Sequence, residues 1–296
     1  MADAAPSYDR LIENFLSWAK REENIRAAVI IGSRARTDHP ADEWSDLDLL
    51  IVADDPRRLL ERDEWLRTIG APRITFLEPT PGDGGFERRV LFAGGLDVDF
   101  APVSTDDVRL WIGNSLPPMA ADILHRGVKV LVDKDGLAER MRAGAEPPAT
   151  AAPPACSEFL NAVNDFWYHA VWTAKHLRRG ELWWAHSCCD VHLKNLLRRA
   201  LEWHARSART GIDTWMRGRF LEEWADPGAL ADLPATFARH ETEDVWRALR
   251  ATMDLFACLA ADAASRWKYP YPSAGEETAR SLVEAYYAGR TVHDPT

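Results

Sequence analysis

The fold is decided by I-I-G-S-R at 30–34, followed by S-D-L-D-L-L-I-V at 45–52. The first motif ends an apolar, β-branched stretch that begins at Ile25, which is typical of a buried strand closed by a turn. The second motif begins another apolar strand. Because side chains on a strand alternate between its faces, Asp46 and Asp48 are predicted to project to one side, roughly 6.5–7 Å apart.

Paired carboxylates of this kind favour cation binding. Asp46 and Asp48 repel each other unless a cation lies between them, and hard divalent ions such as Mg²⁺ take oxygen ligands. The pair could therefore hold one or two such ions. A third carboxylate is expected from G-L-D-V-D-F, where Asp97 and Asp99 face one way on a later predicted strand. The residues themselves leave open which of the two completes the site.

The Gly-Ser turn beside the carboxylates suits a phosphate. Gly32 has no side chain, so a triphosphate could approach the backbone amides closely, and the Ser33 hydroxyl adds a donor. Taken alone, a Gly-Ser dipeptide is usually a plain turn and a D-x-D motif can be a solvated edge. The ordered set of strand, turn, paired acids and later acid favours a phosphate and metal site.

The rest of the chain divides into two halves of different pattern. Apolar spacing in the first half predicts helices over 8–21 and 57–68 and strands over 25–31, 47–52, 73–77, 89–92 and 96–103. In the second half it predicts helices over 159–179, 182–206, 214–224 and 242–267. We expect an α+β protein, with a mixed-sheet domain over 1–145, a Pro/Ala linker over 146–155 and a helical bundle over 156–296.

Composition limits the classes of partner. The 296 residues include 36 Lys and Arg and 46 Asp and Glu, a net charge of −10. That balance disfavours nucleic acid and would attract a small cationic molecule. No run of roughly 18 apolar residues predicts a membrane span. No secretory signal is visible and no C-x-x-C motif occurs among the four cysteines, so we expect reduced thiols and a cytoplasmic location.

The ordered motif resembles the nucleotidyltransferase superfamily with a DNA polymerase β-like palm, whose signature is a Gly-Ser, a D-x-D and a later acid. Further segments are similar to the aminoglycoside 6-adenylyltransferase (streptomycin adenylyltransferase) family over nearly the whole chain. They are V-L-F-A-G-G-L-D-V-D-F at 90–100, D-F-W-Y-H-A-V-W-T-A-K-H-L-R-R-G-E-L at 165–182, L-L-R-R-A-L-E-W at 196–203 and W-K-Y-P-Y-P at 267–272. Matching the family's I-D-L to V-D-F here selects Asp99 as the third acid.

The resemblance implies a reaction and its cofactors. AMP would pass from ATP to a hydroxyl of a streptomycin-like aminoglycoside, with release of pyrophosphate, on two Mg²⁺ ions. Asp46 and Asp48 would bridge the metals, and Asp99 would hold the ion nearer the attacking hydroxyl. The N-terminal domain would then be a nucleotidyltransferase palm, and the bundle would bind the acceptor.

The same resemblance gives roles to the turn. Gly32 and Ser33 would seat the β- and γ-phosphates. Arg34 would add positive charge to the same phosphates, although an ordinary surface arginine is an equally good interpretation of that residue.

The helical half should supply the general base and the acceptor site. The family's acid position falls on Ser187 here, with Asp190 one turn away. Asp165 and Asp190 are the candidates for the base, with Glu158 behind them, and a solvated helix acid is the alternative for each. Carboxylates and tryptophan faces would bind the cationic acceptor, and core packing is the alternative for each ring. The candidates are Asp165, Asp190, Trp167, Trp172, Trp183 and Trp184.

Several alternatives remain open at this stage. The acceptor could instead be a lincosamide or a protein side chain, or the chain could be a non-catalytic, antitoxin-like nucleotide-binding module. A monomer or a weak homodimer is expected. The spacing of His186, Cys188, Cys189 and His192 matches no standard structural zinc pattern, so packed thiols and surface imidazoles are predicted there.

Overall fold

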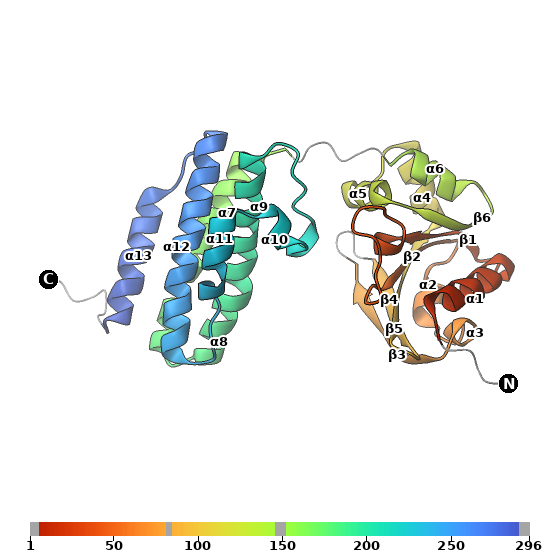
Figure 1. Ribbon diagram of the computed structural model, residues 1–296, viewed down its shortest axis with the longest axis horizontal. Coiled ribbons are helices and arrows are strands. Elements are labelled where there is room, and N and C mark those ends of the chain that lie inside the picture. The colour runs from red at the N-terminus through yellow and green to blue at the C-terminus, as the bar shows by residue number, and fades with distance from the viewer. Residues whose placement is uncertain (1–5, 81–84, 146–151, 290–296) are drawn as a thin grey trace. The chain divides into compact units, whose positions relative to one another are not determined.

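The computed structural model describes residues 6–80, 85–145 and 152–289. The chain forms two compact units, Met1–Pro148 and Ala149–Thr296 (Figure 1). Residues 146–151 of the predicted linker lie outside the described residues. The remaining linker residues, 152–155, have no regular structure and lead directly into a helix.

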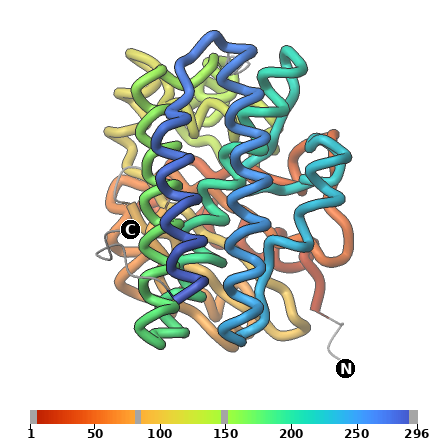
Figure 2. The backbone as a smooth tube through the Cα atoms, turned by 90° about the vertical axis from the view of Figure 1, so that its left-hand side faces the viewer, coloured from red at the N-terminus to blue at the C-terminus, as the bar shows by residue number. Residues whose placement is uncertain are grey.

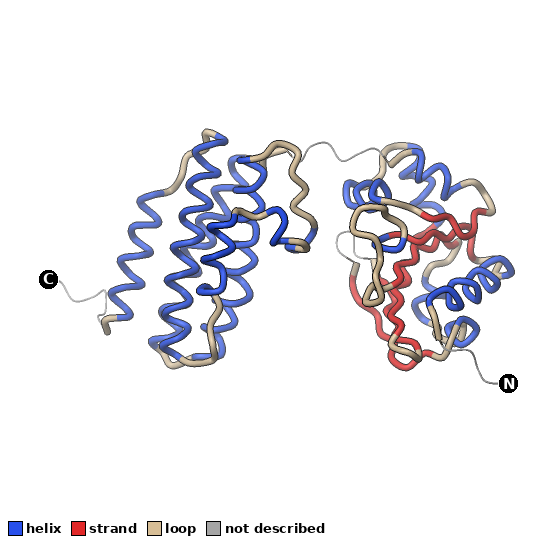
Figure 3. The backbone as a smooth tube through the Cα atoms, in the orientation of Figure 1, coloured by secondary structure: helices blue, strands red, loops and turns tan. Residues whose placement is uncertain are grey.

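The first unit is built on one six-stranded sheet (Figure 3). Its strands are β1 (Ile25–Ile31), β2 (Leu47–Ala53), β3 (Pro72–Pro79), β4 (Phe86–Phe92), β5 (Leu96–Ser104) and β6 (Lys129–Asp133). They lie in the order β3-β4-β5-β2-β1-β6. The central pair, β2 and β5, is parallel, and the other neighbours are antiparallel. The prediction of a mixed sheet is therefore confirmed.

Helices cover both faces of this sheet. Those on one face are α1 (Tyr8–Arg21), α2 (Arg57–Glu61) and α3 (Leu66–Ile69), and those on the other are α4 (Thr105–Gly113), α5 (Pro118–Arg126) and α6 (Leu137–Ala143). α1 has the predicted bounds because Leu11, Phe15 and Ala19 repeat at helical spacing and are buried, and Ser7 caps its first turn. The sheet thus has one apolar core on each face.

The predicted helix over 57–68 is wrong as a single element. It divides into α2 and α3 because Arg62 adopts an extended backbone. The carbonyls of Leu59 and Leu60 at this break accept hydrogen bonds from the Arg88 guanidinium of β4. These bonds from Arg88 take the place of helical hydrogen bonds at the Leu59 and Leu60 carbonyls. No local sequence pattern predicts them.

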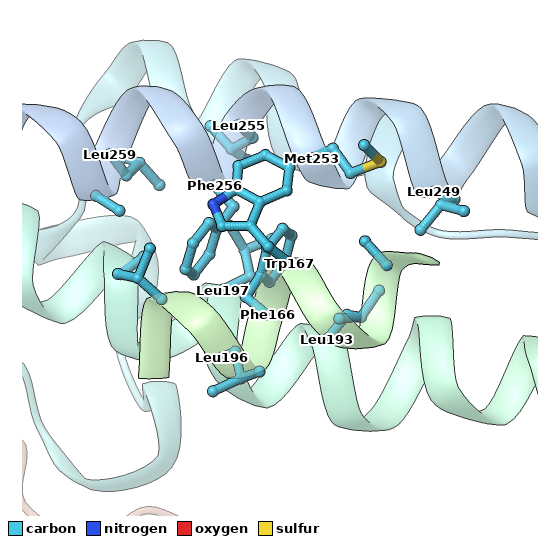
Figure 4. Packing of buried hydrophobic residues seen from close by; sticks show 14 of the residues in the cluster. Phe166, Trp167, Leu193, Leu196, Leu197, Leu249, Met253, Leu255, Phe256 and Leu259 are labelled. Carbon is cyan, nitrogen blue, oxygen red and sulfur yellow. The ribbon is translucent and has the colours of Figure 1, made fainter. Parts of the chain in front are cut away.

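The second unit is a helical bundle, as predicted. Its helical segments are α7 (Cys156–Arg178), α8 (Leu182–Ser187), the π-helical segment η2 (Cys188–His192), α9 (Leu193–Ala208), η3 (Met216–Gly218), α10 (Leu221–Trp224), α11 (Pro227–Asp232), η4 (Leu233–Thr236), α12 (Thr242–Trp267) and α13 (Ser273–Tyr287). α12 packs along α9, and α13 packs along α7 (Figure 2). Phe166 and Phe256 stack with ring centroids 3.6 Å apart in the core, where the Trp167 ring also lies (Figure 4).

Two helix predictions in this unit need correction. The helix predicted over 182–206 is interrupted by η2, where the chain makes one π-helical turn. The helix predicted over 214–224 is wrong, since only η3 and α10 form there. Trp215, Arg217 and Phe220 have positive φ angles of 47°, 58° and 53°, which a continuous α-helix cannot accommodate.

The four cysteines are unpaired, as expected. Within the described part of the chain, no helix is both long and apolar enough to cross a bilayer.

Candidate active site

The acidic residues singled out from the sequence meet at the centre of the sheet. Asp48 on β2 is the direct register partner of Asp99 on the parallel strand β5. Asp46 lies just before β2 rather than on it, because the strand begins at Leu47. One carboxylate oxygen from each of the three acids lies within 4.8 Å of the other two. The parallel pairing of β2 and β5 thus brings together acids that are about fifty positions apart.

Position 32 requires a glycine because the Asp48 carboxylate lies against it. It has φ +70°, which glycine adopts at little cost, and it begins the short turn that follows β1. A Cβ atom at this position would lie 2.1 Å from Oδ2 of Asp48. Only a residue without a side chain fits between the turn and the carboxylate.

Ser33 carries an unsatisfied polar group at the same place. Its hydroxyl oxygen is buried and has no hydrogen-bond partner among the described residues. The Ser33 backbone carbonyl, by contrast, accepts a hydrogen bond from the Ala41 amide at 3.0 Å. Buried hydroxyls are normally paired, so an orphaned one beside clustered acids suits a site that a ligand completes.

Arg34 holds the turn against the segment that carries Asp46. Its Nε donates to the Asp46 carbonyl at 2.8 Å, and its Nη2 donates to the Ser45 carbonyl at 2.7 Å. The guanidinium also stacks 3.6 Å from the centroid of the Tyr8 ring. These contacts give Arg34 a positioning role that the sequence did not suggest.

Arg89 lies beside the third acid and was missed by sequence reasoning. It is the register partner of Asp99 across β4 and β5, and its Nη1 lies 3.3 Å from Oδ2 of Asp99. Burial raises the pKa of Asp99 to about 6, against the opposing effect of the Arg89 charge. Alternation along β4, together with the hairpin signal of Gly94-Gly95 between β4 and β5, could have placed Arg89 opposite Asp99.

The donor set fits a hard divalent cation. All three side chains at the centre offer carboxylate oxygens, the ligands that Mg²⁺ prefers. The glycine contact and the orphaned Ser33 hydroxyl lie on the adjoining turn. Asp46, Asp48 and Asp99 could therefore hold the metal.

The bundle places its two candidate bases in different surroundings. Oδ2 of Asp190 lies 3.0 Å from His186 Nε2, and Oδ1 lies 3.5 Å from Lys194 Nζ. Oδ1 of Asp165 lies 2.6 Å from His169 Nδ1 and 2.9 Å from His192 Nε2. The two acids thus belong to separate networks.

Glu158 and Cys189 lie in other surroundings. Glu158 pairs with Arg199 at 2.8 Å on the exposed side of α7. Burial raises the pKa of the Cys189 thiol to about 12, as expected for a packed cysteine.

The candidate tryptophans divide by exposure. Trp167 is 3% exposed, and its indole nitrogen donates to the Tyr271 hydroxyl at 3.3 Å, so its ring serves the core. Trp183 and Trp184 are 74% and 56% exposed. The Trp183 ring lies 6.0 Å from that of His240, which in turn contacts His186. The exposed Trp183 ring is therefore linked to Asp190 through His240 and His186.

Comparisons with known proteins find a matching family model, similar sequences and a similar solved structure. The family model described as streptomycin adenylyltransferase matches residues 6–286. The aminoglycoside 6-adenylyltransferase of Bacillus subtilis (strain 168) is 24% identical over 91% of this chain and 94% of its own length. That of Staphylococcus aureus is 23% identical over 90% and 94%. The crystal structure of an aminoglycoside 6-adenyltransferase from Bacillus subtilis has 20% identity, a TM-score of 0.45, and coverage of 96% of this chain and 99% of that one.

Proposed function

Because this chain belongs to the streptomycin adenylyltransferase family, we propose that it transfers AMP from ATP to a hydroxyl of a cationic aminoglycoside, releasing pyrophosphate. The observation that carries this proposal is the meeting of Asp46, Asp48 and Asp99 beside the Gly32 turn. Three carboxylates next to a turn that begins with glycine suit a metal-bound triphosphate.

The three acids would hold two Mg²⁺ ions. Bound there, the ions would neutralise charge on the attacking and leaving oxygens of the phosphoryl transfer. Asp46 and Asp48 would contribute carboxylate oxygens to the metal, and Asp99 would contribute the third carboxylate. Arg89 stays beside Asp99 and balances part of the excess negative charge that three clustered carboxylates create.

The turn would bind the β- and γ-phosphates. Gly32 lets the phosphates approach the backbone, and the Ser33 hydroxyl, which lacks a partner within the described chain, donates to a phosphate oxygen. Arg34 acts through Asp46 and Ser45, whose carbonyls it binds, and so fixes the turn relative to the first acid. It is a positioning residue in this scheme.

The transfer step forms one bond and breaks one bond. The acceptor hydroxyl oxygen bonds to the α-phosphorus, and the bond from that phosphorus to the bridging oxygen of the β-phosphate breaks. The hydroxyl proton passes to a general base, for which we propose Asp190, whose Oδ2 lies 3.0 Å from His186 Nε2. Asp165 is engaged by two imidazoles and is left out of this role.

A cationic acceptor is favoured by charge and by exposed aromatic rings. The chain carries a net charge of −10, which attracts ammonium and guanidinium groups. Trp183 offers an open ring face near the Asp190 network for a cation–π contact.

The test measures pyrophosphate release from ATP and Mg²⁺ with streptomycin and a panel of other aminoglycosides, and the mass of each drug afterwards. We expect release that depends on one of these drugs, and one added AMP on that drug. Asp48→Asn should lower turnover at least about 1,000-fold, because a metal ligand is lost. Asp97→Asn, two residues before Asp99 on β5, is the matched control and should retain activity.

Other outcomes would redirect the proposal. AMP found on a lincosamide or on a protein, with none on any aminoglycoside, would keep the chemistry and replace the acceptor. ATP binding without any turnover across the panel would indicate a non-catalytic nucleotide-binding module.

A further inference from the structure

The bundle contains a second group of metal-ligating side chains, and we propose that Asp165, His169 and His192 form a binding site for a divalent transition-metal ion of the Zn²⁺ class. Asp165 and His169 lie one turn apart on α7, and His192 ends the π-helical segment η2. One ligand atom from each lies within 4.8 Å of the other two. All three residues belong to the second unit, and the proposal does not depend on the proposed transfer reaction.

The distances fit a hydrogen-bonded precursor of such a site. Oδ1 of Asp165 lies 2.6 Å from His169 Nδ1 and 2.9 Å from His192 Nε2, and the two imidazole centroids are 4.1 Å apart. Ligand atoms around one tetrahedral Zn²⁺ lie roughly 3.3 Å apart, given metal–ligand distances of about 2.0–2.2 Å. Small side-chain rotations would therefore place the three ligand atoms around one ion. The ion would take the place of the protons that now lie between the Asp165 oxygen and the two imidazole nitrogens.

The charge around Asp165 favours a cation. Within the described part of the chain, no Lys or Arg nitrogen lies within 4.0 Å of its carboxylate, whose ion-pair partners are the two histidines. Asp190 and Asp262, by contrast, have Lys194 at 3.5 Å and Arg266 at 2.7 Å beside them. A dication at Asp165 would supply a positive charge that no described Lys or Arg provides there.

The donor set decides which ion is expected. Two imidazole nitrogens and one carboxylate oxygen suit Zn²⁺, Co²⁺ or Ni²⁺, whereas Mg²⁺ prefers oxygen ligands alone. The side chains of Asp165, His169 and His192 are 31%, 31% and 41% exposed, so an ion can enter from solvent. With three protein ligands, the fourth position of the ion stays open for water.

The backbone next to the site is unusual in a way that supports function. A π-helical turn of five residues, Cys188–His192, interrupts the otherwise α-helical path from α8 into α9. Such turns are rare and frequently lie at functional sites, because the extra residue changes the direction of the side chains that follow. Here the turn ends on His192, the one ligand that α7 does not supply.

The test is a zinc titration of the full chain. Protein stripped with EDTA and desalted is titrated calorimetrically with Zn²⁺ in excess Mg²⁺, and zinc anomalous scattering locates the ion in crystals. We expect one strong site, with an anomalous peak among the three side chains. His169→Ala and His192→Ala should each weaken binding by roughly 10- to 100-fold or more.

Matched controls separate this site from others. His204→Ala removes a histidine that pairs with Asp262 at 2.7 Å and belongs to no three-ligand group among the described residues, so it should leave zinc affinity unchanged. Asp46→Asn, in the first unit, should also leave zinc affinity unchanged. Circular dichroism and thermal unfolding in EDTA would show that the alanine variants fold like the unsubstituted chain.

Unchanged zinc affinity in folded His169→Ala and His192→Ala would overturn the proposal. So would an anomalous peak at any other place with none among Asp165, His169 and His192. Loss of AMP transfer in a sheet variant has no bearing on either result, which keeps the two proposals distinguishable.

Discussion

The Cβ position of Gly32 and the carboxylate of Asp48 occupy almost the same space, since a built Cβ would lie 2.1 Å from Oδ2. The turn and the acid therefore cannot be changed independently. Any side chain at position 32 must displace the acid that pairs with Asp99 in the sheet. This relationship explains why a Gly-Ser turn and a D-x-D motif belong together in one site.

Gly32→Ala should abolish AMP transfer while costing only about 1–2 kcal/mol of unfolding free energy from the positive φ. Turnover and denaturant unfolding measure the two effects separately. Gly95→Ala is the matched control, because Gly95 has φ +75° and open space around its Cβ position. It should show the same backbone cost with normal activity. Similar activity losses in both variants would contradict the steric explanation.

Arg34→Ala should lower kcat roughly 100-fold, because small displacements of reacting groups cost about that much, with little change in KM for ATP. Arg34→Lys should not rescue it, since an ammonium cannot donate in a fixed fork to the carbonyls of Asp46 and Ser45. Steady-state kinetics of both variants would decide. A raised KM for ATP that lysine restores would instead indicate a direct phosphate contact.

Asp99→Asn should stabilise the metal-free protein at neutral pH. The folded-state pKa of Asp99 is raised to about 6, above its unfolded value of about 3.9, so ionisation of this group opposes folding. The contribution of Asp99 to the free energy of unfolding is most favourable below pH 4 and is lost as the pH rises through 6. The gain from the substitution should grow over that window to about 3 kcal/mol and then level off, as urea unfolding in EDTA would measure. A gain that shrinks with rising pH would contradict this.

Trp183→Ala should raise the KM for the aminoglycoside about two- to fivefold, because an exposed cation–π contact is worth about 0.5–1 kcal/mol. Its stability should not change, since the ring is 74% exposed. Trp44→Ala, 83% exposed in the first unit, should change neither property. Trp167→Ala should instead cost about 3–5 kcal/mol of stability, because it empties part of the core. Kinetics and thermal unfolding of the three variants test whether Trp183 binds the acceptor and Trp167 stabilises the core.

Asp190→Asn should lower kcat by about 10²–10⁴-fold if this carboxylate serves the acceptor hydroxyl, while ATP binding persists. Glu158→Gln is the control, because Glu158 pairs with Arg199 and is 58% exposed. It should behave like the unsubstituted chain. Full activity of Asp190→Asn would require another base.

The sequence predicts well those elements whose stability is local. The spacing of Leu11, Phe15 and Ala19 specifies α1, and the apolar stretch from Ile25 specifies β1, both with the observed bounds. The resemblance of the ordered acids to a known motif selects Asp99, and the strand pairing places it beside Asp48.

Features that depend on distant contacts could not be predicted. The break between α2 and α3 depends on Arg88 of β4, which lies about thirty positions away along the chain. The Asp165 and His192 contact joins residues on different helical segments, and no spacing rule covers such a pair. Positive φ angles at Trp215, Arg217 and Phe220 replace a helix that helical periodicity favours.

The parallel pairing of β2 with β5 has a consequence for refolding. A shift of one residue between these strands would send Asp48 and Asp99 to opposite faces and expose the apolar residues between them. Misaligned molecules would therefore be unstable as well as inactive. Protein recovered from denaturant should accordingly regain full specific activity per folded molecule, with no long-lived population that is native in shape yet catalytically dead.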